Sequence, residues 1–455
     1  MGRLVVVSNR VPSPRGKQKA GGLAAGLWGA LRRSGGLWFG WSGEQSEQGP
    51  QRAHRDRADN IDLTTVDLTP EQYRDYYLGA SNRVLWPVFH NLLHRMTVEP
   101  GYADAYKKVN RCFAQRLVDE LQPDDTLWVH DYHLIPLGRE LRELGVDTPI
   151  GFFLHIPFPP AEVAVALPWH EEAAFDLCHY NLVGFQSRRD SDNFQAFMRR
   201  EMDGMCREER IYFRDRVVHS GVFPIGIDVE FWRSMRDNPE FARARKRTEG
   251  IFNQRRMLVG ASRLDYTKGL PQLFTAFERL LDRSQYWRRR AQLIQVASPS
   301  RQPVSEYREF SEELSAQFGR INSRAMVDWA PIRYLHRFYS QPELAALHSL
   351  AAVGVVPPLR DGMNLVAKEF IAAQDPDDPG ALVLSMFTGA AAQLTDAVMV
   401  NPYDTEGFAD ALDYALRMPL DERIDRWRAM YASIEHEDIG WWRDEYLRAL
   451  RNVDA

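Results

Sequence analysis

The 455-residue sequence has few cysteines, no long apolar segment and no marked excess of either charge. Its three cysteines form no Cys-x-x-Cys pair, which argues against a disulfide scaffold or a cysteine zinc site and favours a reducing compartment. The apolar run at residues 4–7 is too short for a signal peptide, and no run reaches the roughly 18 apolar residues of a membrane span. We therefore expect a soluble protein of the cytoplasm.

The charge balance also excludes two classes of partner. Lys and Arg number 57 and Asp and Glu 62, so the formal net charge is −5. This balance gives no overall attraction to nucleic acid or to an anionic membrane, and we expect neither as a partner. The oligomeric state stays open, with a homo-oligomer as one outcome.

Short apolar runs alternate with helical patterns along the whole chain. The strand-like runs are residues 4–8, 126–129, 149–154, 182–186, 257–262, 292–297, 353–357 and 381–385. Such alternation is typical of βαβ units with parallel sheets. We predict an α/β fold of two Rossmann-like, doubly wound domains facing a central cleft. We expect an acceptor-binding domain at 1–235 and a nucleotide-sugar-binding domain at 236–455. Whether the last helix, about 438–455, crosses back to the first domain is left open.

Polar residues follow several of these runs. Arg10, Asp131 and His155 come after strands of the first half, and Arg263, Arg301 and Asp361 come after strands of the second. Ligands of open α/β sheets bind beyond the carboxyl ends of the strands. Because these polar residues follow strands in both halves of the chain, we predict one ligand-binding cleft.

Two segments of the second half suit a phosphorylated ligand. One segment offers the forked guanidinium of Arg263, the ammonium of Lys268 and a helix start at Gly269. These groups could bind a diphosphate, or they could simply form a solvated basic loop. In residues 361–369, Asp361 precedes a helix with Asn364 as its expected N-cap, and Glu369 could accept two ribose hydroxyls. By itself this second segment could equally be a well-capped helix with a surface carboxylate.

The first half offers weaker signals. Gly21-Gly22 would let the backbone approach a phosphate, and Arg10 with Arg301 could grip a phosphate monoester. Tyr77 and Trp86 lie in a segment with a weak strand signal and could stack on a sugar ring or simply pack in the core. The histidines at 130, 133 and 155 lack the spacing of a zinc site, so we predict no metal.

Taken together, these segments resemble the retaining trehalose-6-phosphate synthases, glycosyltransferases of family 20 with the GT-B fold. The matching stretches are residues 3–10, 21–23, 36–43, 85–87, 130–133, 151–159, 263–266 with 268–269, and 361–369. Single stretches are weak, but their order over residues 1 to about 450 is specific. The resemblance implies transfer of glucose from UDP-glucose to glucose 6-phosphate, giving α,α-trehalose 6-phosphate and UDP, with both substrates as partners and no cofactor.

The resemblance also implies a role for each matching residue. The acceptor site would contain Arg10, Tyr77, Trp86, Asp131 and Arg301. The donor site would contain Gly22, Arg263, Lys268, Tyr339, Asp361, Leu365, Val366, Ala367, Lys368 and Glu369. The catalytic set would be His155, Asp131, Asp361, Arg263 and Lys268, with Trp86 and His155 selecting the anomer and no metal ligand.

The chemistry leads us to expect a front-face mechanism. No pair of carboxylates suggests the double displacement of retaining hydrolases, so we expect the leaving phosphate to take the acceptor proton while His155 stabilises donor hydroxyls. The alternatives are another phosphorylated acceptor, such as glycerol 3-phosphate, and a non-catalytic sugar-nucleotide sensor. The base of the donor nucleotide (UDP, GDP or ADP) cannot be read from the residues.

Overall fold

The computed structural model divides into two compact α/β units. It describes residues 2–12, 26–29, 31–32, 35–51, 53–252, 255–300, 304–325 and 329–453. Unit 1 comprises Met1–Ile225 and Gly440–Ala455, and unit 2 comprises Gly226–Ile439. The division falls ten residues before the position expected from the sequence, and the end of the chain belongs to unit 1. No helix of the described residues is both long and apolar enough to cross a membrane.

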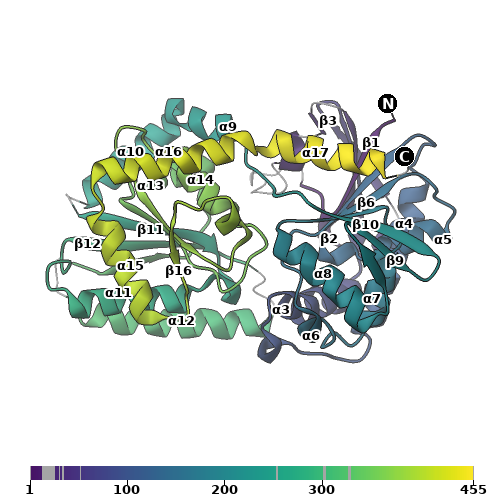
Figure 1. Ribbon diagram of the computed structural model, residues 1–455, viewed down its shortest axis with the longest axis horizontal. Coiled ribbons are helices and arrows are strands. Elements are labelled where there is room, and N and C mark those ends of the chain that lie inside the picture. Colours follow the sequence, from purple (N-terminus) through teal and green to yellow (C-terminus); the bar gives the residue numbers. More distant parts are fainter. Residues whose placement is uncertain are drawn as a thin grey trace. The chain divides into compact units, whose positions relative to one another are not determined.

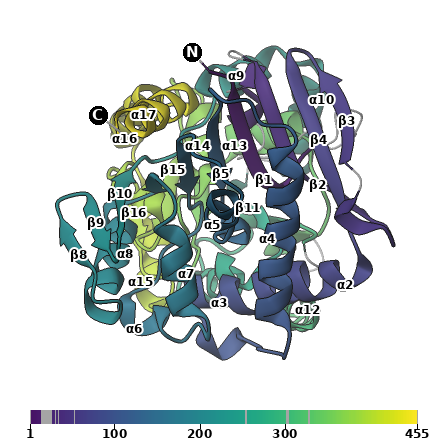
Figure 2. The ribbon, with the colours of Figure 1, turned by 90° about the vertical axis from the view of Figure 1, so that its right-hand side faces the viewer.

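Unit 1 is built on a ten-stranded sheet in the order β3-β4-β2-β1-β5-β6-β7-β10-β9-β8. The strands are β1 (Leu4–Arg10), β2 (Gly36–Gln45), β3 (Ala53–Ala58), β4 (Ile61–Leu68), β5 (Thr126–His130), β6 (Ile150–Phe153), β7 (Leu182–Phe185), β8 (Met205–Arg207), β9 (Arg210–Phe213) and β10 (Arg216–Val222). From β4 to β10 in this order, neighbours are parallel, while β3, β9 and β8 add antiparallel edges (Figure 2). The central strands are buried along almost their whole length, as expected for a parallel sheet covered on both faces.

The helices of unit 1 include one segment that we had not predicted to be helical. They are α2 (Pro70–Gln72), the π-helical η2 (Tyr73–Leu85), α3 (Trp86–Phe89), α4 (Tyr102–Val118), α5 (Leu137–Glu143), α6 (Ala161–Ala164), α7 (His170–Leu177), α8 (Arg188–Glu201) and α17 (Ile439–Asn452). The segment with Tyr77 and Trp86 is therefore helical, and the weak strand signal there was wrong. Thr69 starts this helix through a capping box with Gln72, and Pro70 occupies its first turn.

The last helix, α17, packs on the sheet of unit 1 (Figure 1). The Tyr446 hydroxyl donates to the carbonyl oxygens of Phe152 (3.0 Å) and Leu182 (3.3 Å). A Cβ at Gly151 or Gly184 would lie within 2.4 or 2.6 Å of the Tyr446 ring or its hydroxyl, so these glycines admit the ring. The helix thus covers β6 and β7, an arrangement that sequence left open.

Unit 2 contains a six-stranded parallel sheet in the order β13-β12-β11-β14-β15-β16. Its strands are β11 (Arg256–Arg263), β12 (Ala291–Ser298), β13 (Ile332–Leu335), β14 (Val353–Val356), β15 (Ala381–Ser385) and β16 (Val398–Val400). Its helices are α9 (Val229–Ser234), α10 (Pro239–Phe252), α11 (Leu270–Arg283), α12 (Ser305–Ser323), α13 (Gln341–Leu350), α14 (Leu365–Ala373), α15 (Thr405–Arg417) and α16 (Leu420–His436).

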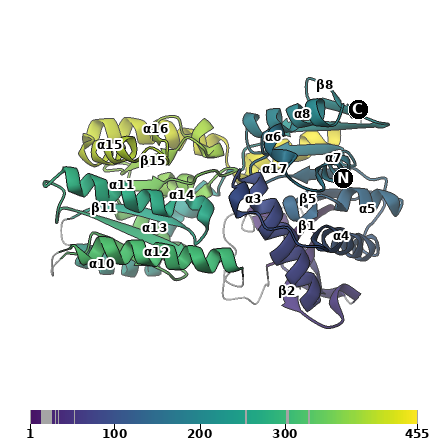
Figure 3. The ribbon, with the colours of Figure 1, turned by 90° about the horizontal axis from the view of Figure 1, so that it is seen from below.

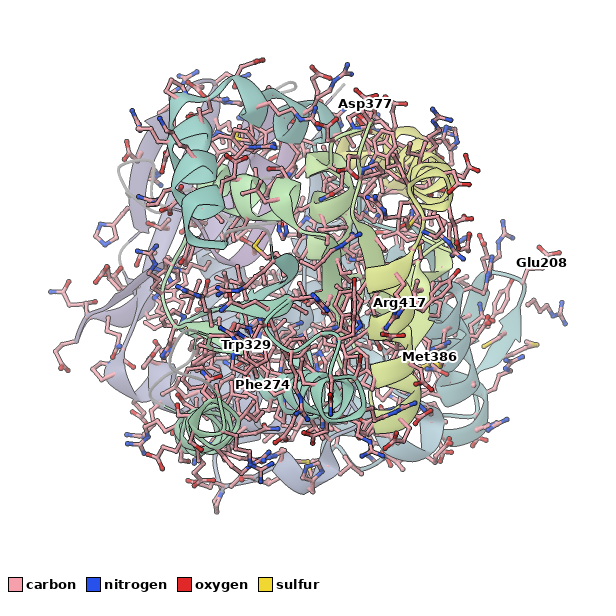
Figure 4. All side chains as sticks on the ribbon, turned by 90° about the vertical axis from the view of Figure 1, so that its left-hand side faces the viewer. Glu208, Phe274, Trp329, Asp377, Met386 and Arg417 are labelled. Carbon is pink, nitrogen blue, oxygen red and sulfur yellow. The ribbon has the colours of Figure 1, made fainter. Side chains whose placement is uncertain are left out.

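The helices of unit 2 cover both faces of its sheet. In Figure 1, α11, α12 and α15 lie on one face, and α10, α13, α14 and α16 lie on the other. Seen from below, α11 and α12 run side by side (Figure 3). Phe274 of α11 and Trp329, both labelled in Figure 4, are buried, with 0% and 7% of their surface exposed. Both faces are covered, so ligands can reach the sheet only at its edges and strand ends.

Candidate active site

Unit 1 brings three predicted residues to one edge of its sheet. Arg10 ends β1, Asp131 follows β5, and His155 lies two residues after β6. These strands are neighbours, with Ser8 paired to His130 and His130 paired to Phe153. Because parallel strands end at the same edge, the three side chains emerge next to one another.

Asp131 adopts a backbone conformation that is strained for any residue except glycine. Its φ is 77° and its ψ is 162°, a region populated almost only by glycine. Its N–H donates to the Phe153 carbonyl (2.8 Å), and its Oδ1 accepts from the backbone N–H of His155 (3.2 Å). These two hydrogen bonds hold the strained conformation and fix the carboxylate at the strand end, against the backbone of His155.

Arg10 stands beside a row of aromatic rings. Its guanidinium lies 5.9 Å from the centre of the Trp41 ring, which lies 5.3 Å from Tyr77, and Tyr77 stacks on His133 at 6.0 Å. Gly43 leaves room for the guanidinium, because a Cβ there would be 2.6 Å from Arg10 Nη2. Trp41 was missed from sequence, although it lies within a matching stretch. The arrangement pairs an exposed cation with an apolar wall, which suits a phosphorylated sugar.

Trp86 is a packed residue with only 3% of its surface exposed. Its ring lies 4.1 Å from that of His90 and 5.7 Å from that of Tyr132. Its predicted contact with the acceptor therefore involves at most a small edge of the ring. Arg301 and Gly22, predicted for the acceptor and donor sites, lie outside the described residues.

His155 is a neutral imidazole in this setting. Burial lowers its pKa to about 3, because the charged ring loses its hydration. Its Nε2 lies 3.0 Å from His130 Nδ1, and its Nδ1 lies 3.3 Å from Gln186 Nε2. A neutral ring excludes His155 as a cationic acid near neutral pH and leaves it hydrogen bonding as its chemistry.

In unit 2, Arg263 ends the central strand β11. Its side chain is 45% exposed, and its Nη2 lies 3.9 Å from Oδ2 of the buried Asp265. Asp265 is held in turn by the N–H (3.0 Å) and hydroxyl (2.9 Å) of Thr267 and by the hydroxyl of Tyr307 (3.1 Å). A fixed carboxylate below an exposed guanidinium orients the cation while leaving its outer edge open to an anion.

Lys268 and Asp361 form an ion pair that sequence did not predict. Lys268 Nζ donates to Asp361 Oδ2 at 2.6 Å, and the side chains are 11% and 13% exposed. Asn364 Nδ2 donates to the same oxygen at 3.0 Å. We assigned these two residues to different parts of one ligand, a diphosphate and a sugar. If both residues contact that ligand, the ion pair between Lys268 and Asp361 must break when the ligand binds.

The helix α14 begins beside this pair without its expected cap. Asn364 occupies the N-cap position with φ 80° and ψ 87°; its Nδ2 donates to Asp361, and its Oδ1 accepts no capping hydrogen bond. The predicted N-cap position of Asn364 is therefore confirmed, but its side chain does not cap the helix. The amides of Leu365, Val366 and Ala367 begin the helix, where the helix dipole favours an anion.

Two ionisable residues of α14 differ in what they can offer. Lys368 is 0% exposed, and burial lowers its pKa to about 7 although the charge of Glu437 opposes this. Its side chain is therefore part of the core, and only the backbone of Lys368 could contact the donor substrate. Glu369 is only partly buried, and loss of hydration raises its pKa to about 7.

Tyr339 lies further along the same sheet edge. It follows β13, which is separated from β11 by β12, and the Arg337 guanidinium lies 4.3 Å from its ring centre.

Among the residues that the structure describes, no group of three or more His, Cys, Asp or Glu side chains could hold a metal ion.

The sequence profile of glycosyltransferase family 20 matches residues 3–452. The chain belongs to glycosyltransferase family 20. A trehalose-6-phosphate synthase of Sinorhizobium fredii is 45% identical to it over 99% of this chain and 98% of the relative, and one of Enterobacter is 42% identical over 100% and 96%.

Solved structures of similar proteins share the fold over 99% of this chain. The UDP-forming α,α-trehalose-phosphate synthase of Burkholderia xenovorans, in complex with glucose 6-phosphate, has a TM-score of 0.96 and is 41% identical, covering 99% of this chain and 100% of that one. A trehalose-6-phosphate synthase structure from E. coli, bound with UDP-2-fluoro glucose, has a TM-score of 0.94 at 40% identity, with 99% of each chain covered. The predicted α/β fold with two parallel-sheet domains of the GT-B type is confirmed, as is the resemblance to family 20.

Proposed function

We propose that the protein is a retaining glucosyltransferase that moves glucose from UDP-glucose to glucose 6-phosphate, releasing UDP and α,α-trehalose 6-phosphate. The observation that carries this proposal is full-length similarity to UDP-forming synthases, including one in complex with glucose 6-phosphate and one with UDP-2-fluoro glucose. The strand-end residues of both units supply the chemistry that such substrates need.

Unit 1 binds the acceptor in this proposal. Arg10 takes the phosphate of glucose 6-phosphate, the Tyr77 ring faces the sugar with the buried Trp41 ring packed against it, and Asp131 accepts a sugar hydroxyl. The guanidinium suits this role because it is exposed and already oriented by the Trp41 ring. The strained Asp131 is held before any ligand arrives, so less orientation is lost on binding.

Unit 2 binds the donor and supports departure of UDP. Arg263, Lys268 and the first amides of α14 face the diphosphate, where negative charge grows as the glycosidic bond breaks. Asp361, released from Lys268, accepts a hydroxyl of the glucose, and Glu369 accepts the ribose hydroxyls. The leaving phosphate oxygen takes the proton of the acceptor hydroxyl on the same face. Capture of a covalent glucosyl adduct on Asp131 or Asp361 would contradict this front-face route.

The experiment that tests the function is a donor-by-acceptor screen of the purified protein. UDP-, ADP- and GDP-glucose are each combined with glucose 6-phosphate, glycerol 3-phosphate and glucose, and nucleotide release and product are measured. We expect UDP and α,α-trehalose 6-phosphate from the first pair. Binding of UDP-glucose without UDP release from any acceptor would instead indicate a sensor. Turnover with glycerol 3-phosphate alone would move the activity to another product.

We expect activity without a divalent metal. In our proposal, Arg263, Lys268 and the N-terminus of α14 neutralise the diphosphate, which is what a metal ion does in other phosphate sites. Initial rates after dialysis against EDTA should equal those with added Mg²⁺ or Mn²⁺. A rate that disappears with EDTA and returns with either metal would refute this part of the proposal.

We expect the affinity for UDP-glucose to rise with pH around neutrality. Glu369 has a pKa of about 7 in the fold against 4.5 ordinarily, so below pH 7 it keeps a proton and accepts hydroxyls poorly. KM for UDP-glucose should fall roughly threefold to tenfold from pH 6 to pH 8, the range of one improved hydrogen bond. The Glu369→Gln variant should show a high KM at both values. An equal pH response in this variant would place the titrating group elsewhere.

The same shift has a consequence for stability. Between pH 4.5 and 7 the folded state holds a proton on Glu369 that the unfolded chain has lost, so its contribution to the free energy of unfolding falls as pH rises through this window. The variant Glu369→Gln should flatten that part of the pH profile, measured by urea unfolding.

We place the enzyme in the cytoplasm as part of the proposal, because both substrates are phosphorylated metabolites. The three cysteines are all free, which agrees with a reducing compartment.

A further inference from the structure

The carboxamide of Gln186 connects the end of β7 with His155. The backbone N–H of Ile225 lies 2.9 Å from Gln186 Oε1, and a backbone N–H can only donate. The atom that it meets must therefore be the oxygen, which fixes the orientation of the amide. Gln186 Nε2 then faces His155 Nδ1 at 3.3 Å. Because the amide nitrogen donates, His155 Nδ1 must accept and carries no proton.

The same logic passes from His155 to His130. A neutral imidazole without a proton on Nδ1 carries it on Nε2, and this atom lies 3.0 Å from His130 Nδ1. His130 Nδ1 is then an acceptor, and the proton of His130 lies on Nε2. The reverse direction would require a proton on His155 Nδ1, directly opposite the N–H of Gln186. Only one tautomer of each histidine therefore satisfies both hydrogen bonds.

The surroundings keep both rings neutral. His130 is 0% exposed, and its ring lies 4.6 Å from Trp128 and 6.2 Å from Trp442 of α17. Its Nε2 is buried and has no hydrogen-bond partner among the described residues. Burial lowers the pKa of both histidines, and each charge would further penalise the other. A proton added to either ring would also remove the acceptor on which one of the two hydrogen bonds depends.

We propose that Gln186 and His130 are positioning residues that fix His155 as the neutral Nε2–H tautomer, so that the ring offers an accepting Nδ1 to a hydroxyl of the sugar substrate. The bond from Gln186 is the longer of the two, 3.3 Å against 3.0 Å, and is therefore the one that a donating hydroxyl replaces. The backbone of His155 is held separately by Asp131. The use of Nδ1 by substrate rests on the proposed function, whereas the tautomer does not.

The first test measures the tautomer directly. In deuterated protein labelled with [¹⁵N]histidine, the shifts of the two ring nitrogens show which carries the proton. The His155 signals are assigned by their loss in His155→Asn. We expect a bare Nδ1 and a protonated Nε2 in the substrate-free enzyme at pH 7. A proton on Nδ1 would overturn the proposal, whatever the activity of the enzyme.

The second test reverses the hydrogen bond from Gln186. In Gln186→Glu one oxygen can still accept from Ile225, while the other accepts from His155 and draws a proton onto Nδ1. We expect altered ¹⁵N shifts for His155, a loss of about tenfold in kcat/KM for UDP-glucose and an unchanged KM for glucose 6-phosphate. Wild-type shifts and rates in this variant would overturn the proposal.

The chain offers a matched control for that charge change. Gln195 on α8 is buried and donates to the Ser220 hydroxyl at 3.0 Å, with no contact to His155. Gln195→Glu makes the same chemical change in the same unit, and we expect wild-type His155 shifts and wild-type kcat/KM. If this variant changed the His155 shifts as much as Gln186→Glu does, the assigned role of Gln186 would fail.

The third test separates acceptance by His130 from packing. Asn and Leu are similar in size, but only Asn has an oxygen near the position of the histidine Nδ1. We expect His130→Asn to keep most of kcat/KM and the His155 tautomer, and His130→Leu to lose about tenfold. Equal losses in both, with His155 shifts unchanged, would show that His130 only fills space. If the enzyme turns over no pair of donor and acceptor substrates, the proposed function is wrong, but the ¹⁵N shifts still test the His155 tautomer.

Discussion

Replacing Lys268 with Met should reduce kcat by about 10²–10³-fold, the range for removing one preorganised group that stabilises developing charge. The ammonium lies in the short turn that follows the central strand β11, 2.6 Å from Asp361 Oδ2, and in our proposal it exchanges this carboxylate for the diphosphate. Met keeps the length of the side chain and removes the charge. The measurement is steady-state UDP release at saturating UDP-glucose and glucose 6-phosphate.

A control and a second variant make this result interpretable. Lys246→Met removes an exposed lysine of α10 in the same unit and should leave kcat unchanged. Asp361→Asn, alone and with Lys268→Met, separates two roles of the lysine. If Lys268 acts on the diphosphate, the double variant should be much slower than Asp361→Asn alone. If the two are equally slow, Lys268 only holds Asp361, and our assignment of the ammonium to the diphosphate is wrong.

The positions of Arg10, Asp131 and His155 could be predicted because they depend on local signals. Each follows a short apolar run, and parallel strands necessarily end at one edge. The pairing of Lys268 with Asp361 could not be predicted in this way. The two residues are 93 positions apart, and their contact depends on β14 lying beside β11, which is a matter of strand order.

We also failed to predict the strands β2 and β3 and the hydrogen bonds of Gln186 from the sequence. The antiparallel strand β3 is mostly exposed and carries charged residues, so it has no apolar run to recognise. Trp41 was missed because the strand that carries it, β2, was not among the predicted runs. Gln186 was assigned to the end of a predicted strand, but its role depends on a backbone N–H of Ile225, 39 residues away. No local pattern encodes such a contact.

The helical segment at Tyr73–Leu85 is an instructive exception, because its signal was present in the sequence. Thr69, Pro70 and Gln72 form the start of a helix by side-chain chemistry alone. The segment with Tyr77 and Trp86 gave a weak strand signal, but capping and proline placement outweigh such a weak preference. Capping residues are thus a better guide here than aromatic content.

Replacing Asp131 with Gly or with Ala should give two variants that differ in stability but not in activity. Ala and Gly both remove the carboxylate, but only Gly adopts φ 77° and ψ 162° without strain. Relief of about 1–3 kcal/mol of strain exceeds the about 0.4–1 kcal/mol that the flexibility of Gly costs in the unfolded chain. Asp131→Gly should therefore be more stable than Asp131→Ala by about 1 kcal/mol, or about 2–4 °C in Tm.

Both variants should lose activity equally, because the carboxylate that accepts the acceptor hydroxyl is missing from each. A charge-assisted hydrogen bond of about 1.5–3 kcal/mol corresponds to a loss of about tenfold to a hundredfold or more in kcat/KM for glucose 6-phosphate. Asp203, with φ 54° in an exposed position of the same unit, provides the control, since Asp203→Ala should keep full activity. Equal Tm values for the two Asp131 variants would show that the backbone stores no strain at this site. An Asp131→Gly enzyme more active than Asp131→Ala would show that the conformation, rather than the carboxylate, supports catalysis.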